Sequence, residues 1–326
     1  MFARLAAASA RLSTAYRASG ADPPYGDPRL AHRVAMEGYY WRLWDPGSGR
    51  CIVALCGVCR DPAGAPWAVV ALAAHPGGLV RWVVAPRAWA DPRALGAAAW
   101  DGDAPVLRGT ERRVALDLGA GARLEAVLEG RAEWPDRALG GLGVAQVVPG
   151  LPQYWHPVVL GARVRGEALL GGETVSLDGW EAYVEKNWGG AFPGVWWWGQ
   201  AGFGDGAMAA FAGGVLAGRL GASGLVLRAG GEVVRLAPPA ALVRADVGGG
   251  EWRLRARSAR WSATLEGEGG EPHILPVPVP AERRAVMRSE HHLAGRLRVV
   301  ARRGRREVLR AESALAGLEL GTPDGS

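Results

Sequence analysis

The same pattern, an aromatic strand followed by a glycine turn and an apolar strand, occurs twice in this chain of 326 residues, 157 positions apart. A shift by that distance places Tyr39–Trp41 on Trp196–Trp198 and the turn glycine Gly47 on Gly204. A β-hairpin repeated half a chain apart predicts two similar β domains, because each copy begins the same supersecondary unit. Coincidence among the abundant glycines is the alternative, and the aligned aromatic triplets argue against it.

Short apolar segments that end at Gly, Pro or Asp fill both halves of the chain, which is typical of antiparallel strands. No strand alternates with a long helix, so a parallel α/β fold is not expected. We predict an all-β fold of two barrel- or sandwich-like domains, residues 31–170 and 171–326, after a leader at residues 1–30. The expected strands are 36–45, 51–58, 68–73, 79–84, 111–117, 122–128, 224–228, 232–236, 252–256, 260–266, 293–301 and 307–313.

Three segments depart from this strand pattern. A helical excursion is expected around Pro92 to Trp100, and a stiff extended connector at Pro276 to Pro280. The leader is basic, rich in Ser and Ala, and free of acidic residues until Asp22, which imitates a transit peptide. A short surface helix over Phe2–Ala18 explains it as well. We interpret the leader as that helix and expect a cytoplasmic protein.

The stretch from Asp178 to Gly206 holds five of the fifteen tryptophans and the single lysine and asparagine of the chain, Lys186 and Asn187. The abundance of Ala, Gly, Arg and Pro is typical of a GC-rich genome, in which Lys and Asn codons become rare. Their survival side by side suggests positions that require a compact ammonium and a neutral amide. Chance survival is the alternative.

The sequence lacks the motifs that hold common cofactors. We find no GxGxxG, P-loop, GxSxG or HExxH in the context that each requires, so neither a nucleotide cofactor nor a classical hydrolase is expected. His291 and His292 would face opposite ways on a strand, with no third ligand nearby, so no metal site is expected. The CxxC of Cys56 and Cys59 lies in an expected strand without a second pair, which favours buried structural thiols.

The net charge of +6 permits attraction to phosphates or to an anionic membrane surface. The arginine cluster at residues 302–306 could touch lipid headgroups, but a solvated turn between two strands is the favoured interpretation. A nucleic-acid partner is not expected, because no recognisable binding module is present. Peripheral membrane contact and the oligomeric state stay open. No apolar run reaches the roughly 18 residues that a membrane-spanning helix needs.

The segment YVEKNWGGAFPGVWWWGQ, from Tyr183 to Gln200, resembles the central motif of the tocopherol cyclase family. The flanking segments MEGYYW, QYWHPV and SALAGLELG resemble that family too, and the resemblance covers most of the chain from about Pro24. It implies tandem lipocalin-like barrels and a cofactor-independent isomerase that closes the chromanol ring of a prenylated hydroquinone. The wider superfamily includes hydratases and other cyclases of isoprenoids. The chain departs from the family in its leader and in its arginine-rich C-terminal third.

Such a ring closure requires an acid that protonates an alkene, a dry wall that stabilises the resulting cation, and a phenol held close to it. Tryptophan faces stabilise cations. A carboxyl buried among tryptophans would keep its proton near neutral pH, because burial disfavours the anion. We therefore predict Glu185 first and Glu37 second as the acid. The predicted catalytic residues are Glu185, Glu37, Lys186 and Asn187, and the predicted residues that bind a lipophilic substrate are Tyr40, Trp41, Trp155, His156, Trp188, Trp196, Trp198 and Gln200.

Each assignment has a structural alternative. The Trp196–Trp198 triplet could be barrel core, Glu185 could form an ion pair with Lys186, and Glu37 could pair with Arg42 across a strand. For the whole protein the alternatives are a carrier of a lipophilic isoprenoid that performs no chemistry, and a hydratase or other cyclase. A carrier would tolerate the loss of any single carboxyl, whereas an acid catalyst would not.

Overall fold

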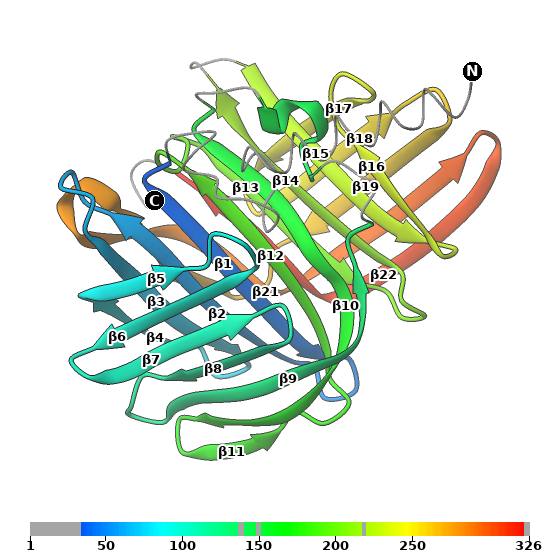
Figure 1. Ribbon diagram of the computed structural model, residues 1–326. Helices are drawn as coiled ribbons and strands as arrows, with labels where there is room; N and C mark the ends of the chain where they lie inside the picture. Colours follow the sequence, from blue (N-terminus) through cyan, green and yellow to red (C-terminus); the bar gives the residue numbers. More distant parts are fainter. Residues whose placement is uncertain (1–33, 136–139, 148–150, 217–219, 323–326) are drawn as a thin grey trace, which may run out of the picture.

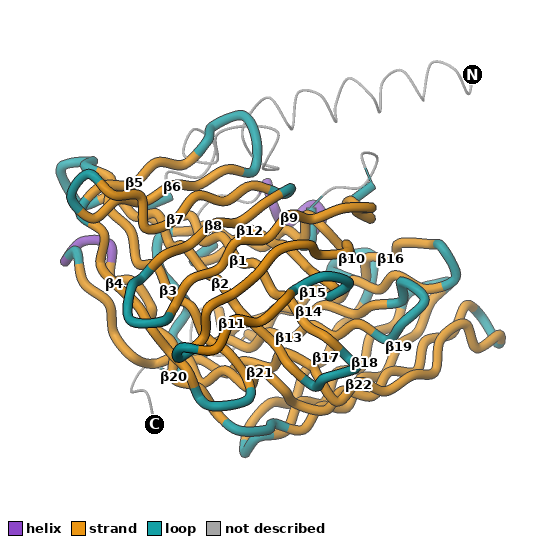
Figure 2. The backbone as a smooth tube through the Cα atoms, turned by 90° about the horizontal axis from the view of Figure 1, so that it is seen from below, coloured by secondary structure: helices purple, strands orange, loops and turns teal. Residues whose placement is uncertain are grey.

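The computed structural model describes residues 34–135, 140–147, 151–216 and 220–322, and most of them lie in antiparallel strands (Figures 1 and 2). The expected leading helix at Phe2–Ala18 lies outside these residues. Two short 3-10 helices accompany the strands, η1 (Gly143–Val147) and η2 (Pro280–Glu282). No helix among the described residues has the length and apolar character needed to cross a membrane.

The first sheet has twelve strands in the order β4-β3-β2-β1-β12-β10-β9-β8-β7-β6-β5, with β11 paired to β10. Its strands are β1 (Met36–Asp45), β2 (Arg50–Arg60), β3 (Pro66–His75), β4 (Leu79–Ala85), β5 (Arg87–Ala90), β6 (Gly96–Asp101), β7 (Ala104–Thr110), β8 (Arg113–Asp117), β9 (Ala122–Glu133), β10 (Gln153–Leu170), β11 (Glu173–Ser176) and β12 (Glu181–Gly189).

The second sheet has ten strands in the order β16-β15-β14-β13-β22-β21-β19-β18-β17, with β20 paired to β21. Its strands are β13 (Trp196–Gly202), β14 (Met208–Leu216), β15 (Leu220–Ala229), β16 (Glu232–Leu236), β17 (Leu242–Gly248), β18 (Glu251–Arg257), β19 (Trp261–Glu268), β20 (Pro272–Val279), β21 (Arg284–Arg303) and β22 (Arg306–Gly321).

The two copies of the repeated hairpin occupy equivalent places in the two sheets. β1 lies between β2 and β12, and β13 lies between β14 and β22. In each sheet the two edge strands follow each other in the chain, β4 by β5 and β16 by β17, so the sheet rolls up until its edges approach (Figure 1). The predicted all-β fold of tandem barrel-like units is therefore confirmed. The sheets divide between Gly189 and Trp196, whereas the expected boundary lay between residues 170 and 171.

Alternation of side chains gives each barrel its own core and leaves a third core between them. On β1, Tyr39, Trp41 and Leu43 point into the first barrel. Tyr40 and Trp44 point the other way and pack with side chains of the second sheet. Successive strand residues face opposite sides of a sheet, so a strand that is apolar on both faces must be covered on both. β1 is such a strand, and this places its outer face at the junction of the two barrels.

Two sequence predictions of local structure are wrong. The segment expected to be helical around residues 92–100 contains strand β6, which pairs with β5 and β7. Sheet pairing outweighs the helix propensity of its alanines. The proline run at residues 276–280 is not a free connector, because most of it belongs to β20, which pairs with β21. Proline has no N–H to donate, and β20 has a described partner on one side only, which is where prolines are tolerated.

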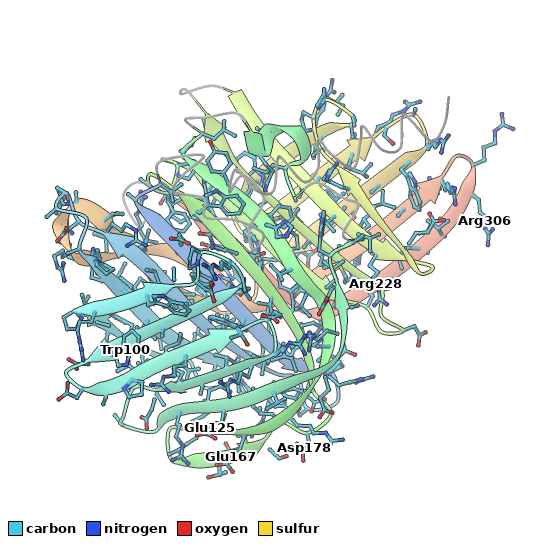
Figure 3. The ribbon with its side chains drawn as sticks, viewed as in Figure 1. Trp100, Glu125, Glu167, Asp178, Arg228 and Arg306 are labelled. Carbon is cyan, nitrogen blue, oxygen red and sulfur yellow. The ribbon has the colours of Figure 1, made fainter. Side chains whose placement is uncertain are left out.

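The arginine cluster at residues 302–306 forms the tip of the β21–β22 hairpin, and Arg306 extends from this tip away from the barrels (Figure 3). Arg302 pairs with Glu307, and Arg303 pairs with Glu232 on β16. These exposed pairs agree with the interpretation of a solvated turn between strands.

Candidate active site

A cavity of about 250 Å³ lies at the junction of the two barrels rather than inside either one. Its walls come from β1, β2, β10 and β12 of the first sheet and from β13, β14, β15, β20, β21 and β22 of the second, and η1 contributes to its lining. Most of the lining is apolar or aromatic. The polar residues in its wall include Tyr40, Gln153, Glu185, Asn187, Ser223, Ser289, His291 and Glu319, and the aromatic ones include Trp155, Phe192, Trp196, Trp197 and Trp198.

Strand register brings the first polar groups into this wall. Tyr40 on β1 lies opposite Glu185 on β12, and both face the second barrel. On β13 the spacing of two residues puts Trp196 and Trp198 on one side. The alternating pattern of the central motif therefore supplies both a carboxyl and an indole wall to the same cavity.

Glu185 is buried and is held by three donors that all converge on one oxygen, Oε2. The donors are Tyr183 Oη at 2.7 Å, Trp155 Nε1 at 2.7 Å and Trp198 Nε1 at 2.9 Å. Tyr183 and Trp155 come from the first sheet, whereas Trp198 comes from the second. Oε1 is thus the oxygen available to carry a proton. The carboxyl position is fixed by side chains of both barrels.

Burial raises the pKa of Glu185 to about 7, because the anion loses the solvation it would have in water. The hydrogen bonds from Trp155, Tyr183 and Trp198 oppose this shift, since they stabilise the anion, and the negative charge of Glu319 adds to it. A carboxyl with this pKa is present in both protonation states near neutral pH. It can therefore give a proton and later recover one.

A second polar group, Tyr40 with His291 and Glu319, lies in the same cavity. The hydroxyl of Tyr40 is 3.0 Å from His291 Nε2, and His291 Nδ1 is 3.7 Å from Glu319 Oε2, an ion-pair distance. Ser289 Oγ and Trp196 Nε1 donate to the other carboxyl oxygen, Oε1, at 2.7 and 2.8 Å. The Tyr40 ring packs edge-on against Trp198, with centroids 5.0 Å apart.

The surroundings of Glu319 favour its charged form. Burial alone would raise its pKa, but His291, Ser289 and Trp196 outweigh burial and lower the pKa. The pKa of Tyr40 is raised well above its ordinary value, chiefly by burial, so this hydroxyl keeps its proton. The cavity thus holds two carboxyls whose environments push their pKa values in opposite directions.

Six of the predicted site residues line this cavity: Tyr40, Trp155, Glu185, Asn187, Trp196 and Trp198. The single asparagine of the chain has a steric role here. Asn187 lies opposite Gly38 on β1, and a Cβ on Gly38 would come within 2.4 Å of Asn187 Oδ1. The same oxygen accepts a hydrogen bond from Gln153 Nε2 at 2.7 Å. This amide therefore fills the space that a glycine leaves on the neighbouring strand.

Glu37 and Lys186 do not line the cavity. Lys186 Nζ is 2.9 Å from Glu37 Oε2, and both side chains are almost fully buried, with 1% and 4% of their surface exposed. Lys186 Nζ also lies 4.9 Å from the centre of the Tyr39 ring, which faces the first barrel. Arg60 is a second cation near Glu37, at 3.7 Å. Lys186 and Glu37 thus form a buried ion pair on the opposite side of the sheet from Glu185.

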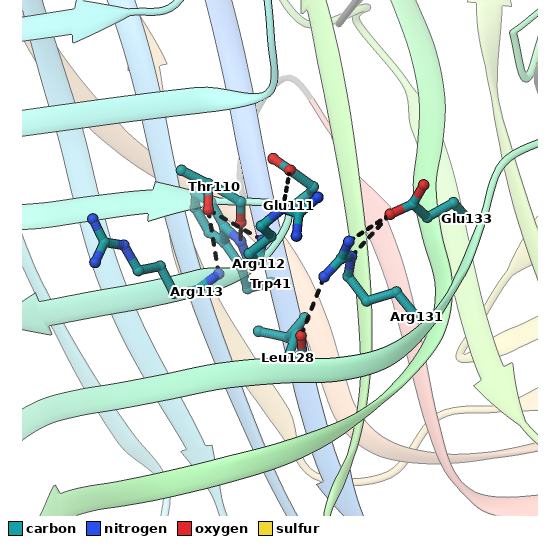
Figure 4. Close-up of polar contacts among 8 residues, drawn as sticks. All are labelled: Trp41, Thr110, Glu111, Arg112, Arg113, Leu128, Arg131 and Glu133. Carbon is teal, nitrogen blue, oxygen red and sulfur yellow. Dashed lines mark hydrogen bonds and ion pairs between the residues drawn. The ribbon is translucent and has the colours of Figure 1, made fainter.

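Trp41 and Gln200, two predicted substrate-binding residues, lie outside the cavity wall. Trp41 is in the first barrel and donates from Nε1 to the carbonyl oxygen of Thr110 at 2.8 Å (Figure 4). Gln200 Oε1 accepts a hydrogen bond from the fully buried Arg42 at 3.0 Å. These contacts are structural: one anchors a strand of the first barrel, and the other joins β1 to β13.

Trp188 and His156 also lie outside the cavity wall. Trp188 stacks on Tyr154, with ring centroids 5.6 Å apart. His156 lies opposite Lys186 in the strand register and packs edge-on against Trp134. The register of β10 and β12 therefore places Trp188 and His156 on the face of the sheet opposite to Glu185.

Sequence reasoning missed His291, Glu319 and Trp197 as cavity residues. His291 was considered only as half of a metal pair, although the alternation argument already separates it from His292. His291 faces the cavity, whereas His292 Nδ1 contacts the carbonyl oxygen of Gly270 and the ring packs against Trp252. Glu319 lies 134 positions beyond Glu185, and no local pattern in the sequence connects the two.

Among the described residues, no group of three His, Cys, Asp or Glu side chains is arranged to hold a metal ion. The three cysteines are buried free thiols. Burial raises the pKa of Cys56 to about 12.

The sequence profile of the tocopherol cyclase-like family matches residues 133–322, more than half of the chain. The chain belongs to the tocopherol cyclase-like family. The match includes β10, β12 and the whole second sheet, and so contains Glu185, His291 and Glu319. No curated protein matches this family member significantly by sequence.

Two solved structures share the fold of this tocopherol cyclase-like protein. A Nitrosomonas europaea protein provisionally assigned as AttH is 12% identical, with a TM-score of 0.52, over 89% of this chain and 93% of its own. Kievitone hydratase from Nectria haematococca is 10% identical, with a TM-score of 0.54, over 94% of this chain and 95% of its own. At these identities the likeness concerns the fold alone.

Proposed function

We propose that this protein is a cofactor-independent cyclase of a prenylated hydroquinone or a related isoprenoid, with Glu185 as the general acid. The observation that carries the proposal is a carboxyl with a pKa of about 7 in an aromatic cavity. A lone carboxyl on a solvated surface would be ionised at that pH, since the ordinary pKa of a glutamate is 4.5. Membership of the tocopherol cyclase-like family supports the same reaction class.

The proposed reaction is an isomerisation in which every atom of the substrate is retained. The proton of Glu185 adds to the less substituted carbon of a trisubstituted alkene, so a C–H bond forms and a tertiary cation develops next to it. The phenol oxygen of the same molecule attacks that cation and forms the ring C–O bond. The phenol loses its proton in this step, and Glu185 regains one before the next cycle.

The cavity wall supplies what the cation requires. The faces of Trp196 and Trp198 are electron-rich and attract positive charge. Because the lining is mostly apolar, water has few partners in it, and the cation is protected from hydration. A prenyl tail is equally well suited to such a wall, since burying apolar surface is favourable by about 25 cal/mol per Å².

The mechanism can be tested by running the reaction in D2O with a prenylated hydroquinone and analysing the product by mass spectrometry. One solvent-derived deuterium should appear at the former alkene carbon, because the acid proton exchanges with solvent before it is transferred. A matched substrate with a saturated tail should bind but remain unchanged. Product without deuterium, or no product from any prenylated hydroquinone, would reject the proposal.

A carrier without catalytic activity is the second candidate, favoured by the apolar character of most of the cavity lining. A hydratase is a variant of the first candidate, because the same acid would generate the same cation and water would capture it. The D2O experiment separates the three. A carrier returns the ligand unchanged. A hydratase adds the elements of D2O, which is a gain of about 19 mass units once the new hydroxyl has exchanged back in ordinary water. A cyclase gives an isomer with one deuterium.

A further inference from the structure

One part of the cavity has no role in the acid step. Tyr40, His291 and Glu319 form a chain of contacts that begins at the cavity wall and ends on a carboxylate. The three residues come from β1, β21 and β22, so only the assembled junction brings them together. A phenol that attacks a cation must lose its proton, and Tyr40 places an acceptor for that proton in the same cavity wall as Glu185, which has just given up its own.

We propose that Tyr40, His291 and Glu319 form a proton relay that accepts the hydroxyl proton of the substrate, opposite the acid Glu185. This proposal rests on the proposed function, and it adds the base that accepts the phenol proton during ring closure. It also names the ligand feature that the site selects: a phenolic hydroxyl rather than an isoprenoid tail alone.

The relay operates by one proton shift at each contact. The substrate O–H bond breaks as its ring C–O bond forms, and that proton passes to the oxygen of Tyr40. The original hydroxyl proton of Tyr40 passes to Nε2 of His291. The imidazolium that results is stabilised by the carboxylate of Glu319, 3.7 Å from its Nδ1. No oxidant, reductant or co-reactant is needed.

The contacts also fix the direction of transfer. Glu319 Oε2 faces Nδ1, which favours the tautomer with its proton on Nδ1 and leaves Nε2 as the acceptor for Tyr40. Ser289 and Trp196 hold the other oxygen of Glu319, so the carboxylate cannot turn away from His291 without losing both hydrogen bonds. The arrangement resembles the orientation of a histidine base by a buried carboxylate in other enzymes.

The two carboxyls of the cavity have environments suited to opposite tasks. Burial raises the pKa of Glu185 to about 7, whereas the partners of Glu319 lower its pKa. Pairs of titratable groups with pKa values pushed apart mark the acid and the base of a site. The other titratable groups facing His291 are Tyr40 and the paired His273 on β20, and burial lowers the pKa of His273, which keeps it neutral.

The relay can be tested without turnover by using a nitrophenol that carries a saturated isoprenoid tail. Its phenolate absorbs visible light, so the absorbance of the bound ligand reports whether its proton has moved to the protein. The wild type should lower the apparent pKa of the bound nitrophenol. His291→Gln and Glu319→Gln should each raise that pKa by one unit or more, which reduces the phenolate fraction about tenfold below the pKa.

Controls separate the relay from general damage to the cavity. Glu290→Gln removes an exposed carboxylate next to His291 on the same strand and should leave the bound pKa unchanged. The O-methyl ether of the ligand, followed by tryptophan quenching, should bind the relay variants as well as it binds the wild type. Tyr40→Phe should raise the pKa of the bound phenol without changing its position in the cavity.

The outcomes distinguish the relay from the proposed function. An unchanged pKa of the bound nitrophenol in both His291→Gln and Glu319→Gln would overturn the relay, even if the wild type cyclises prenylated hydroquinones. A lowered pKa that depends on both residues, in a protein that never cyclises any substrate, would support the relay and reject the cyclase. A wild type that binds neither the nitrophenol nor its ether would overturn both.

Discussion

Tyr40 on β1 and Glu185 on β12 lie directly opposite each other in the first sheet, and each is bound to a side chain of the second sheet. Tyr40 contacts His291 on β21, and Glu185 accepts a hydrogen bond from Trp198 on β13. Side chains of opposed residues lie about 5 Å apart, so the proposed acid and the first member of the proposed relay adjoin. A proton collected by the relay is thus released close to the carboxyl that must recover one.

Replacing the proposed acid should abolish catalysis and preserve binding. Glu185→Gln retains the shape and can still accept from Trp155 and Trp198, but it cannot donate an acid proton. Loss of a general acid should slow turnover by roughly 10²-fold or more. Chromanol formation is measured by liquid chromatography and binding by tryptophan quenching. Glu181→Gln on the same strand is the control, because Glu181 forms a surface pair with Arg163. Equal turnover in the Glu185→Gln and Glu181→Gln variants would contradict the assignment.

The rate should fall as the pH rises through about 7. Only the protonated form of Glu185 can protonate an alkene, and its pKa is raised to about 7 by burial. Above that value the acid fraction decreases tenfold for each pH unit. Single-turnover rates between pH 5 and pH 9 should therefore show a plateau at low pH and a decline at high pH. A rate that increases across this range would show that the working group is a base.

The same carboxyl should make the folded state less stable at high pH. The pKa of Glu185 is higher in the folded protein than its ordinary value of 4.5, so folding takes up a proton between these values. Stability is therefore complete below about pH 4.5 and is lost as the pH rises through about 7. The loss should approach about 3 kcal/mol. Urea unfolding of the wild type and of Glu185→Gln at pH 5 and pH 9 isolates this contribution, because all other groups titrate in both proteins.

The Lys186–Glu37 pair should matter for stability and not for ligand binding. Removing one member of a buried pair leaves an uncompensated charge, so Lys186→Met should destabilise the fold by about 3–5 kcal/mol. The double variant Lys186→Met with Glu37→Gln should recover most of that loss. Urea unfolding measures both. Since neither side chain lines the cavity, ligand affinity should not change in the folded variants; a selective loss of affinity at full stability would place the pair in the site.

A methyl group on Gly38 should disturb the cavity through Asn187. The new Cβ would meet Asn187 Oδ1 at 2.4 Å, so the amide must move and its hydrogen bond with Gln153 must break. Gly38→Ala should weaken binding of the saturated prenylated hydroquinone about tenfold or more, a loss of about 1.4 kcal/mol. Gly190→Ala is the control, because nothing lies within 4 Å of its Cβ position. Adding Asn187→Ala to Gly38→Ala should relieve the clash. If the single variant Gly38→Ala binds the ligand with wild-type affinity, the steric argument fails.

The fold followed from local patterns in the sequence. The repeat of Tyr39–Trp41 at Trp196–Trp198 indicated two equivalent sheets, and alternation placed His291 and His292 on opposite sides of one strand. The second inference holds because a strand has a period of two that does not depend on its neighbours. The segment around residues 92–100 was predicted as helical because alanine has a high helix propensity. In the folded protein, pairing of β6 with both β5 and β7 outweighs that propensity.

The site was only half determined by the sequence. Composition and motif selected Glu185, Trp196 and Trp198, which lie close together in the chain and reach the same cavity. They could not show which side of β1 and β12 faces the second barrel, and that choice separates Glu185 from Glu37. They also could not show that His291 meets Tyr40, because this contact joins residues 251 positions apart in the chain. The docking of two barrels decides both, since each barrel alone would leave these side chains on its outer surface.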